Sequence, residues 1–540
     1  MKSKMSLQAA RGSLVFVAVP LLLLGAVATA MALYGTARYG TGISPDSLSY
    51  LSAAKNLLLG NGFKIYNQEL YLSWPPLFPI ILALTGSAGI DITYGARLIN
   101  AVGFGSIVML AGWLLLNTTR SKPLVFLALL SILFSSPLLS VSVMAWTETG
   151  YTVLSMAFFL VLLACLRSGS RVQLMLCAVV AALASLQRYV GITLVITGAA
   201  AVTFFSHGLS RRKRIIHLLS FSLVSITPLL LWLLRNYLIS GTAAGFRYPA
   251  YYGLLKNISL TSGTLGVWLL PLFFSALLRH LVVIALAVLV IHTHLMPPIS
   301  GAPQEHTIRQ QWLSLITLYC IAYAVFVIAI SSLKAFEPIG DRFLAPLYPL
   351  VMLLVFTAFD DWCQRPTRSR SKQQWITGIT AGILSVWLIY PVSQTVSALS
   401  AWRKEGAGED FFGRSYYGKR AWQESTLAAW LRTHPPGGTV YSNEPLALYT
   451  LTGIVARVSP LKHDAPEQFS SESPLAQESL LVWFNDQFEG QSRFMGKGDQ
   501  VYPVSELRKF FDLEVLQSFA DGVLYRFTIN GNVGSEITLQ

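Results

Sequence analysis

Two acidic residues beside apolar segments are the first candidates for chemistry. Asp46 lies near the start of the segment Ser44–Gly62, and Glu148 stands directly before a long apolar stretch. A carboxylate beside a bound hydroxyl group can take up its proton, so either residue could act as a general base. Each also has a simpler interpretation. Asp46 would be an acid in the first turn of a helix, and Glu148 an interfacial residue held in water.

Basic residues at the ends of apolar segments form the second group. Arginine binds phosphate through paired, charge-assisted hydrogen bonds, which suits a lipid phosphate at a membrane surface. The alternative is that these side chains extend to lipid head groups, or that one of them pairs with Asp341. The candidates are Arg188, Arg235, Arg247, Lys256 and Arg342.

The elements that position these residues belong to a membrane protein. The chain has 540 residues, a mean hydropathy of +0.54 and 12% charged residues, whereas soluble domains carry about 25% charged residues. Only four cysteines are present, which excludes a disulfide-linked scaffold and a Cys-rich zinc module. The basic residues lie in short loops between apolar segments, and no nucleic-acid-binding motif is found. No nucleic-acid partner is therefore predicted.

Charge divides the chain into two parts. Residues 1–400 hold 27 Lys and Arg against 9 Asp and Glu, whereas residues 401–540 hold 13 against 17. This contrast predicts a transmembrane domain over 1–400 and a soluble domain over 401–540. In the second part, strand-like and helix-like segments alternate, which is typical of a small α/β domain. Its role is left open between acceptor binding, shielding of an active site and a passive cap.

Apolar segments predict a polytopic bundle of about eleven transmembrane helices. A crossing helix needs roughly 20 apolar residues, and Lys and Arg favour the cytoplasmic side. That rule predicts that the N-terminus lies in the cytoplasm and residues 401–540 outside, and we expect an integral protein of the inner (plasma) membrane. The predicted spans are 13–34, 94–116, 123–141, 149–167, 172–187, 190–206, 215–234, 265–291, 312–331, 343–360 and 375–395.

The connection of residues 35–93 is predicted to be a large outer loop. Apolar residues recur with helical spacing after Asp46, so we expect an amphipathic helix on the outer membrane surface, ended by Gly60 or Gly62. The apolar segment Trp74–Ile90 is expected to be interfacial or re-entrant. A true crossing there would turn the basic cluster Arg211–Arg214 outward, against the charge rule.

Several short motifs, in this order and on the outer side, resemble the GT-C glycosyltransferase superfamily. More narrowly, they are similar to glycosyltransferase family 39, the group of protein O-mannosyltransferases and lipid A aminoarabinose transferases. The motifs span most of residues 1–360. They are Asp46-Ser47-Leu48-Ser49-Tyr50 followed by Ala53, Ala54, Leu58 and Gly60, Pro75-Pro76-Leu77-Phe78-Pro79, Glu148, Leu186-Gln187-Arg188, Arg235-Asn236 and Arg342-Phe343-Leu344-Ala345-Pro346-Leu347-Tyr348-Pro349.

The resemblance implies a membrane enzyme that moves a sugar from a polyprenyl-phosphate donor to an acceptor hydroxyl, with inversion, on the non-cytoplasmic side. Asp46 would be the general base and Glu148 would orient it or the acceptor. The donor phosphate would be bound by residues among Arg188, Arg235, Arg247, Lys256 and Arg342, with Tyr50 beside them. The partners implied are the donor, membrane lipid, and a lipid, glycan or protein acceptor.

Two features depart from the family pattern. Ser47 follows Asp46, where the eukaryotic protein mannosyltransferases carry an Asp-Glu pair. No histidine of residues 1–400 is predicted on the outer side, so a His-containing metal site is not expected there. Asp and Glu alone can hold a divalent ion, and metal dependence is therefore left open, with no cofactor assigned.

Two other classes share this composition. A transporter or flippase of a lipid-linked saccharide would be equally apolar, but it often shows internal repeats and polar groups at the bilayer midplane. No convincing repeat is found, and the long loop with Asp46 favours an enzyme. A non-catalytic membrane protein of envelope assembly is the third interpretation.

Overall fold

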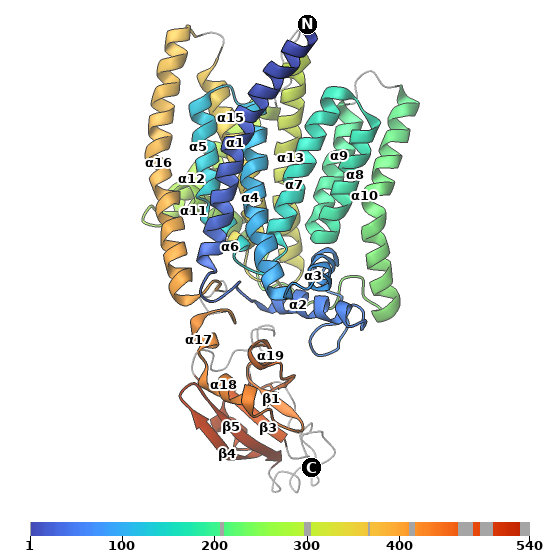
Figure 1. The fold of residues 1–540 in the computed structure, drawn as a ribbon, viewed down its shortest axis with the longest axis vertical. Helices are drawn as coiled ribbons and strands as arrows, with labels where there is room; N and C mark the ends of the chain where they lie inside the picture. The colour runs from blue at the N-terminus through green and yellow to red at the C-terminus, as the bar shows by residue number, and fades with distance from the viewer. Residues whose placement is uncertain are drawn as a thin grey trace.

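The computed structural model describes residues 2–205, 210–295, 304–365, 368–409, 416–462, 479–485 and 501–529. It has three layers along its long axis (Figure 1). A bundle of long helices forms the first layer, two short helices across one end form the second, and a small mixed domain forms the third.

The bundle is built mainly from long apolar helices that run along the same axis, with shorter helices between them (Figure 1). Two single-turn 3₁₀ helices, Tyr189–Gly191 and Ala345–Leu347, connect some of them. The helices are α1 (Lys2–Gly35), α4 (Ile92–Thr118), α5 (Lys122–Leu133), α6 (Ser136–Ser142), α7 (Glu148–Ser168), α8 (Arg171–Gln187), α9 (Ile192–Phe205), α10 (Arg211–Ser240), α11 (Leu254–Leu269), α12 (Ala276–Leu295), α13 (Gln304–Leu333), α14 (Asp341–Leu344), α15 (Tyr348–Cys363) and α16 (Arg370–Glu405).

The predicted number of eleven spans is not confirmed. Among the described residues, eight helices are long and apolar enough to cross a membrane, and a ninth span results if α5 and α6, bent by 42°, are taken together. The predicted spans 172–187 and 190–206 form the shorter apolar helices α8 and α9. The predicted span 265–291 is interrupted between Leu269 and Ala276, where Pro271 lacks the amide hydrogen that a continuous helix needs.

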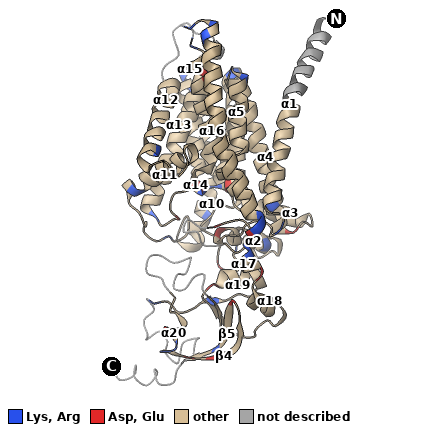
Figure 2. Cartoon of the chain, turned by 90° about the vertical axis from the view of Figure 1, so that its left-hand side faces the viewer, with Lys and Arg blue, Asp and Glu red and all other residues tan. Residues whose placement is uncertain are grey.

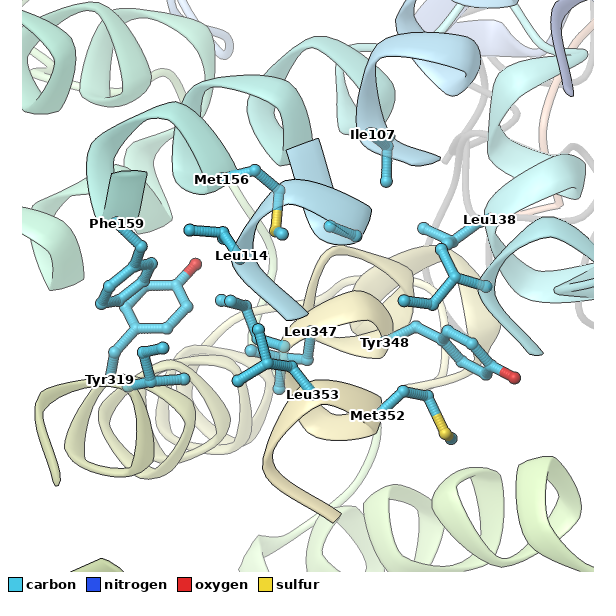
Figure 3. Close-up of a cluster of buried hydrophobic side chains, with 14 of the residues drawn as sticks. Ile107, Leu114, Leu138, Met156, Phe159, Tyr319, Leu347, Tyr348, Met352 and Leu353 are labelled. Carbon is cyan, nitrogen blue, oxygen red and sulfur yellow. The ribbon is translucent and has the colours of Figure 1, made fainter. Parts of the chain in front are cut away.

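The core of the bundle lies where α4, α6, α7, α13 and α15 meet. Figure 3 shows apolar side chains from these helices converging, including Ile107, Leu138, Met156 and Leu353. The hydroxyl groups of Tyr319 and Tyr151 lie 2.9 Å apart inside this core, so each buried phenol has a hydrogen-bond partner. The core anchors the ends of α7, α14 and α15, which carry candidate residues of the site.

The second layer consists of α2 (Pro45–Leu58) and α3 (Leu77–Ser87), which lie at the end of the bundle nearest the third layer (Figure 1). An 11-residue helix such as α3 extends about 16 Å and is too short to cross a bilayer. Residues on all faces of α2 are buried within the protein, including Ser47, Leu48, Ala53 and Ala54, and its expected position on the outer membrane surface stays a prediction. Leu48 packs against the third layer, which the periodicity of α2 alone cannot predict.

The third layer is a small α/β unit with one five-stranded sheet, in the order β2-β1-β3-β5-β4. β1 is parallel to β2 and β3, whereas β5 is antiparallel to β3 and β4. The predicted fold class, a helical membrane bundle with a small C-terminal α/β part, is confirmed. Its elements are α17 (Arg420–Gln423), α18 (Thr426–Thr433), β1 (Val440–Ser442), α19 (Pro445–Thr452), β2 (Arg457–Val458), β3 (Ser479–Phe484), α20 (Val504–Leu507), β4 (Phe511–Phe519) and β5 (Gly522–Ile529).

Candidate active site

The first turn of α2 places Asp46 between the bundle and the α/β unit. Ser44 caps the helix, because its hydroxyl oxygen accepts a hydrogen bond from the amide of Ser47 at 3.2 Å. The indole of Trp146 donates to the same oxygen at 2.7 Å. Pro45 takes the first helical position, where its missing amide hydrogen costs nothing. The cap and the proline together fix the direction in which Asp46 leaves the helix.

Arg342, at the start of α14, joins three carboxylates. Its Nη2 lies 2.5 Å from Oδ2 of Asp46, its Nε lies 2.9 Å from Oε1 of Glu148, and its Nη1 lies 3.2 Å from Oε2 of Glu337. The guanidinium carbon lies 4.2 Å from the ring centre of Trp146. Every nitrogen of this guanidinium therefore binds a carboxylate, and its face rests on an indole.

Glu148 and Arg188 form the deeper part of the same cluster. Glu148 is fully buried at the start of α7, and its Oε1 lies 2.5 Å from Nη1 of Arg188. Arg188 also donates to the hydroxyl of Thr147 at 3.0 Å. Asn100 on α4 holds the preceding turn by donating to the carbonyl oxygen of Trp146 at 3.0 Å. A buried carboxylate of this kind requires such pairing, because an isolated buried charge is strongly unfavourable. We name Asp46, Glu148, Arg188, Glu337 and Arg342 the acid–arginine cluster.

The ionisation of Asp46 is controlled by opposing effects. Burial raises the pKa of its carboxyl group, but Arg342, and at longer range Arg247 and Arg188, lower it, and the net pKa lies below the ordinary value. Asp46 is therefore ionised at neutral pH, as a general base must be. Its side chain keeps 30% of its surface exposed, so one part of the carboxylate can meet a ligand.

Arg247 lies within electrostatic range of Asp46 but does not join the cluster, and the printed contacts of Arg235 lie outside it. Arg235 on α10 donates to Oδ1 of Asn236 at 2.9 Å, and its guanidinium lies 4.9 Å from the ring centre of Trp232. Arg247 donates to the carbonyl oxygen of Ser73 at 3.4 Å and lies over the ring of Phe336 at 4.4 Å. Neither has an acidic partner among the contacts of the described residues. Both remain candidates for an anionic ligand.

The two remaining predicted residues have different surroundings. Tyr50 is buried on α2, where its ring meets Trp74 and Phe78 edge to face at 6.0 and 5.7 Å. Burial, and next the Asp46 carboxylate, raise the pKa of its phenol above the ordinary value, so the phenol is neutral. Lys256 is exposed on α11, and no hydrogen bond or ion pair of the described part of the chain joins it to the cluster.

Three members of the site, Trp146, Glu337 and Tyr416, were not predicted from the sequence. The Tyr416 hydroxyl donates to Oε1 of Glu337 at 2.8 Å. The alternative that a basic residue pairs with Asp341 does not hold for Arg342, because Asp341 accepts a hydrogen bond from the indole of Trp268 at 2.8 Å. No sequence pattern links residues that come from such distant parts of the chain.

The described part of the chain contains no preformed metal site. No group of three or more His, Cys, Asp or Glu side chains there is arranged to hold an ion. The carboxylates of Asp46, Glu148 and Glu337 are directed to Arg342 instead. In this arrangement the arginine occupies the position between the acids.

No protein-family model and no curated protein sequence matches the chain. Solved structures do. ArnT from Cupriavidus metallidurans bound to undecaprenyl phosphate aligns with a TM-score of 0.58 at 12% identity, over 93% of this chain and 97% of that one. The chain has the GT-C fold.

Two further GT-C structures agree with this assignment. ArnT from the same organism in the apo state aligns with a TM-score of 0.56 at 13% identity, over 98% of this chain and 99% of that one. The archaeal oligosaccharyltransferase AglB from Archaeoglobus fulgidus was solved in complex with an inhibitory peptide and a dolichol-phosphate. It aligns with a TM-score of 0.53 at 11% identity, over 86% of this chain and 69% of that one. The GT-C resemblance inferred from short motifs is therefore confirmed for the fold.

Proposed function

We propose that this chain is a membrane glycosyltransferase that moves a sugar from a polyprenyl-phosphate donor to an acceptor hydroxyl. The observation that carries the proposal is the Asp46 carboxylate, held by Arg342 at 2.5 Å between the apolar bundle and the polar α/β unit. A donor with an isoprenoid tail and a phosphate needs both environments at one place. The two ligand-bound GT-C structures support this, because ArnT is bound to undecaprenyl phosphate and AglB to a dolichol-phosphate.

The proposed reaction is a single displacement at the anomeric carbon. Asp46 takes the proton of the acceptor hydroxyl while its oxygen attacks that carbon. The bond between the anomeric carbon and the phosphate oxygen breaks, and polyprenyl phosphate leaves with the electron pair. One displacement inverts the configuration of the sugar. The fully buried Glu148 holds Arg188 and Arg342, and through Arg342 it orients Asp46.

The donor phosphate is assigned to arginines outside the acid–arginine cluster. Arg342 and Arg188 already bind carboxylates, so we assign the phosphate to Arg235 and Arg247. Lys256 on α11 is a further candidate ligand. Fixed guanidinium groups stabilise the negative charge that develops on the leaving group.

The proposed side of the membrane follows from the distribution of basic residues. Basic residues gather at the ends of the bundle, and its middle is almost free of charge (Figure 2). The starts of α10 and α16, which carry Arg211–Arg214 and the pair Arg370 and Lys372, lie at the end opposite to α2 and α3 (Figure 1). Because such clusters favour the cytoplasm, we assign the N-terminus of this inner-membrane protein to the cytoplasm and the α/β unit to the outside.

The test is turnover by the full-length protein in lipid nanodiscs, supplied with undecaprenyl-phosphate hexose or pentose and membrane-derived acceptors. Release of undecaprenyl phosphate is measured by mass spectrometry. We expect Asp46→Asn to reduce release at least 1,000-fold, a magnitude of about 4 kcal/mol, while binding of undecaprenyl phosphate itself is unchanged. Glu69→Gln, an exposed acid of the same outer loop, is the matched control and should retain full turnover.

Two outcomes would contradict the proposal. Full release by Asp46→Asn would remove Asp46 from the reaction. Movement of the intact lipid-linked sugar across vesicles, without release of undecaprenyl phosphate, would replace the enzyme with a flippase.

A further inference from the structure

The segment that connects α16 to the α/β unit passes directly over the start of α2. We name residues 406–409 and 416–419 the connecting segment; 410–415 lie outside the described residues. The amide of Tyr417 donates to the carbonyl oxygen of Ile43 at 2.9 Å. A Cβ atom on Gly408, which has a φ of +100°, would lie 2.7 Å from Sδ of Met144. The connecting segment is therefore packed tightly between the α2 entry and the loop that precedes Glu148.

Tyr416 brings the connecting segment into contact with the acid–arginine cluster. Its side chain is 2% exposed, and its ring meets the Trp146 ring edge to face at 6.1 Å. Its hydroxyl donates to Oε1 of Glu337 at 2.8 Å, while Oε2 of the same carboxylate accepts from Arg342. Burial, and next the Glu337 carboxylate, raise the pKa of Tyr416 above the ordinary value. The hydroxyl therefore keeps its proton and acts as a donor to Glu337.

These contacts form a chain from the connecting segment to the proposed base. Glu337 is the most exposed acid of the cluster, with 36% of its side chain accessible, and an exposed carboxylate on a loop can rotate between several partners. The Tyr416 hydroxyl fixes one of its oxygens. The other oxygen then fixes Nη1 of Arg342, and since a guanidinium is planar, this sets the direction of Nη2 toward Asp46.

We propose that Tyr416 is a positioning residue, whose hydroxyl holds Glu337 and thereby orients Arg342 against Asp46. The α/β unit is thus linked covalently and by a hydrogen bond to the site that carries out the transfer. This inference rests on the proposed function for its kinetic consequence. Its structural consequence, an ordered first turn of α2, is independent of any activity.

The test compares Tyr416→Phe with Tyr449→Phe. Both variants lose one phenolic hydroxyl, and both lie where the C-terminal part meets the outer loop, but Tyr449 contacts Tyr66 at 5.0 Å outside the acid–arginine cluster. For Tyr416→Phe we expect kcat to fall about tenfold with KM for the undecaprenyl-phosphate sugar unchanged within twofold, as expected when a hydrogen bond to a charged group is lost. Tyr449→Phe should match the wild type.

A second readout does not depend on turnover. Hydrogen–deuterium exchange of the peptide that covers residues 44–50 should become faster in Tyr416→Phe, because Trp146 and Arg342 support the α2 cap. Glu337→Gln should cause the same change. The double variant Tyr416→Phe/Glu337→Gln should be no worse than the more affected single variant, since both act through one contact.

The kcat and the exchange of Tyr416→Phe decide whether Tyr416 is a positioning residue. Wild-type kcat and wild-type exchange in Tyr416→Phe would overturn it. An equal loss in Tyr449→Phe would also overturn it, because the effect would then come from docking of the whole unit. If the wild type shows no turnover, the proposed function fails, and the exchange of residues 44–50 still decides the role of Tyr416.

Discussion

At the scale of single residues, the balance of charge in the site explains which arginines can serve a substrate. Asp46, Glu148 and Glu337 contribute three negative charges, and Arg342 and Arg188 contribute two positive charges in direct contact. Arg247 adds a third positive charge at longer range. The cluster is therefore close to neutral before a ligand arrives, and we expect a phosphate to depend on cations at its edge.

Arg247→Gln tests that assignment through the pH dependence of turnover. The pKa of Asp46 lies below its ordinary value because the arginines outweigh burial, so the base is lost only as the pH falls through this lowered pKa. Removing the charge of Arg247 raises the pKa of Asp46, and the acid limb of the kcat profile should move to higher pH. KM for the donor should also rise about tenfold, the effect of losing a charge-assisted hydrogen bond.

The measurement is kcat against pH in nanodiscs, with Arg38→Gln as the control. Arg38 is exposed in the same outer loop and rests on the ring of Tyr39 at 5.1 Å, away from the acid–arginine cluster. Its substitution should leave the acid limb in place. An acid limb that moves to lower pH in Arg247→Gln, or does not move, would contradict the electrostatic account of Asp46.

At the scale of elements, α1 and α4 cross at glycines that permit close backbone contact. A Cβ atom on Gly105 would lie 2.5 Å from the carbonyl oxygen of Gly25 and would also collide with Oγ1 of Thr29. Small residues at such crossings stabilise helix pairs in membranes. We expect Gly105→Ala to separate the two helices and to destabilise the protein by about 1–3 kcal/mol, the usual cost of overpacking.

Thermal unfolding in detergent, followed by intrinsic fluorescence, measures this effect. Gly382→Ala on α16 is the matched control, because no atom lies within 4 Å of the Cβ atom it would add. Its midpoint should be unchanged or slightly higher, since alanine favours a helix over glycine. A midpoint for Gly105→Ala equal to that of Gly382→Ala would show that the crossing tolerates separation.

The sequence predicted the apolar elements well where length and composition decide them. Long helices such as α4, α7 and α10 contain the apolar spans predicted at 94–116, 149–167 and 215–234. The break between α11 and α12 was missed because its residues are as apolar as the helices beside it. The burial of α2 was missed because Leu48 packs against residues of the C-terminal part. A local sequence pattern cannot predict a contact with residues so distant in the chain.

The candidate site was predicted in part for a similar reason. Asp46, Glu148, Arg188 and Arg342 are unusual in their own segments, since charge is rare there, and the structure brings these four together. Glu337 and Tyr416 lie in polar loops where their types are ordinary. Only the path of the connecting segment, which the sequence does not encode locally, brings Tyr416 to Glu337.

At the scale of the whole molecule, the two ends of the bundle carry different parts of the chain. The start of α1 lies at one end, and α2, α3 and the α/β unit lie at the other (Figure 1). If the bundle spans a membrane along its long axis, these ends face opposite compartments. The proposed reaction requires the α2 end to be outside, where the donor sugar and the acceptor would meet.

Cysteine labelling tests this orientation directly. Thr433→Cys places a thiol on exposed α18, and Arg212→Cys places one at the exposed start of α10, at the opposite end of the bundle. A membrane-impermeant maleimide should label Thr433→Cys in intact bacterial spheroplasts, whereas Arg212→Cys should react only after the membrane is permeabilised. The parent protein, with its four cysteines within the bundle helices, gives the background. Labelling in the reverse order would place Asp46 on the cytoplasmic side and contradict transfer on the outer face, and labelling of both before permeabilisation would contradict a bundle that crosses the membrane between them.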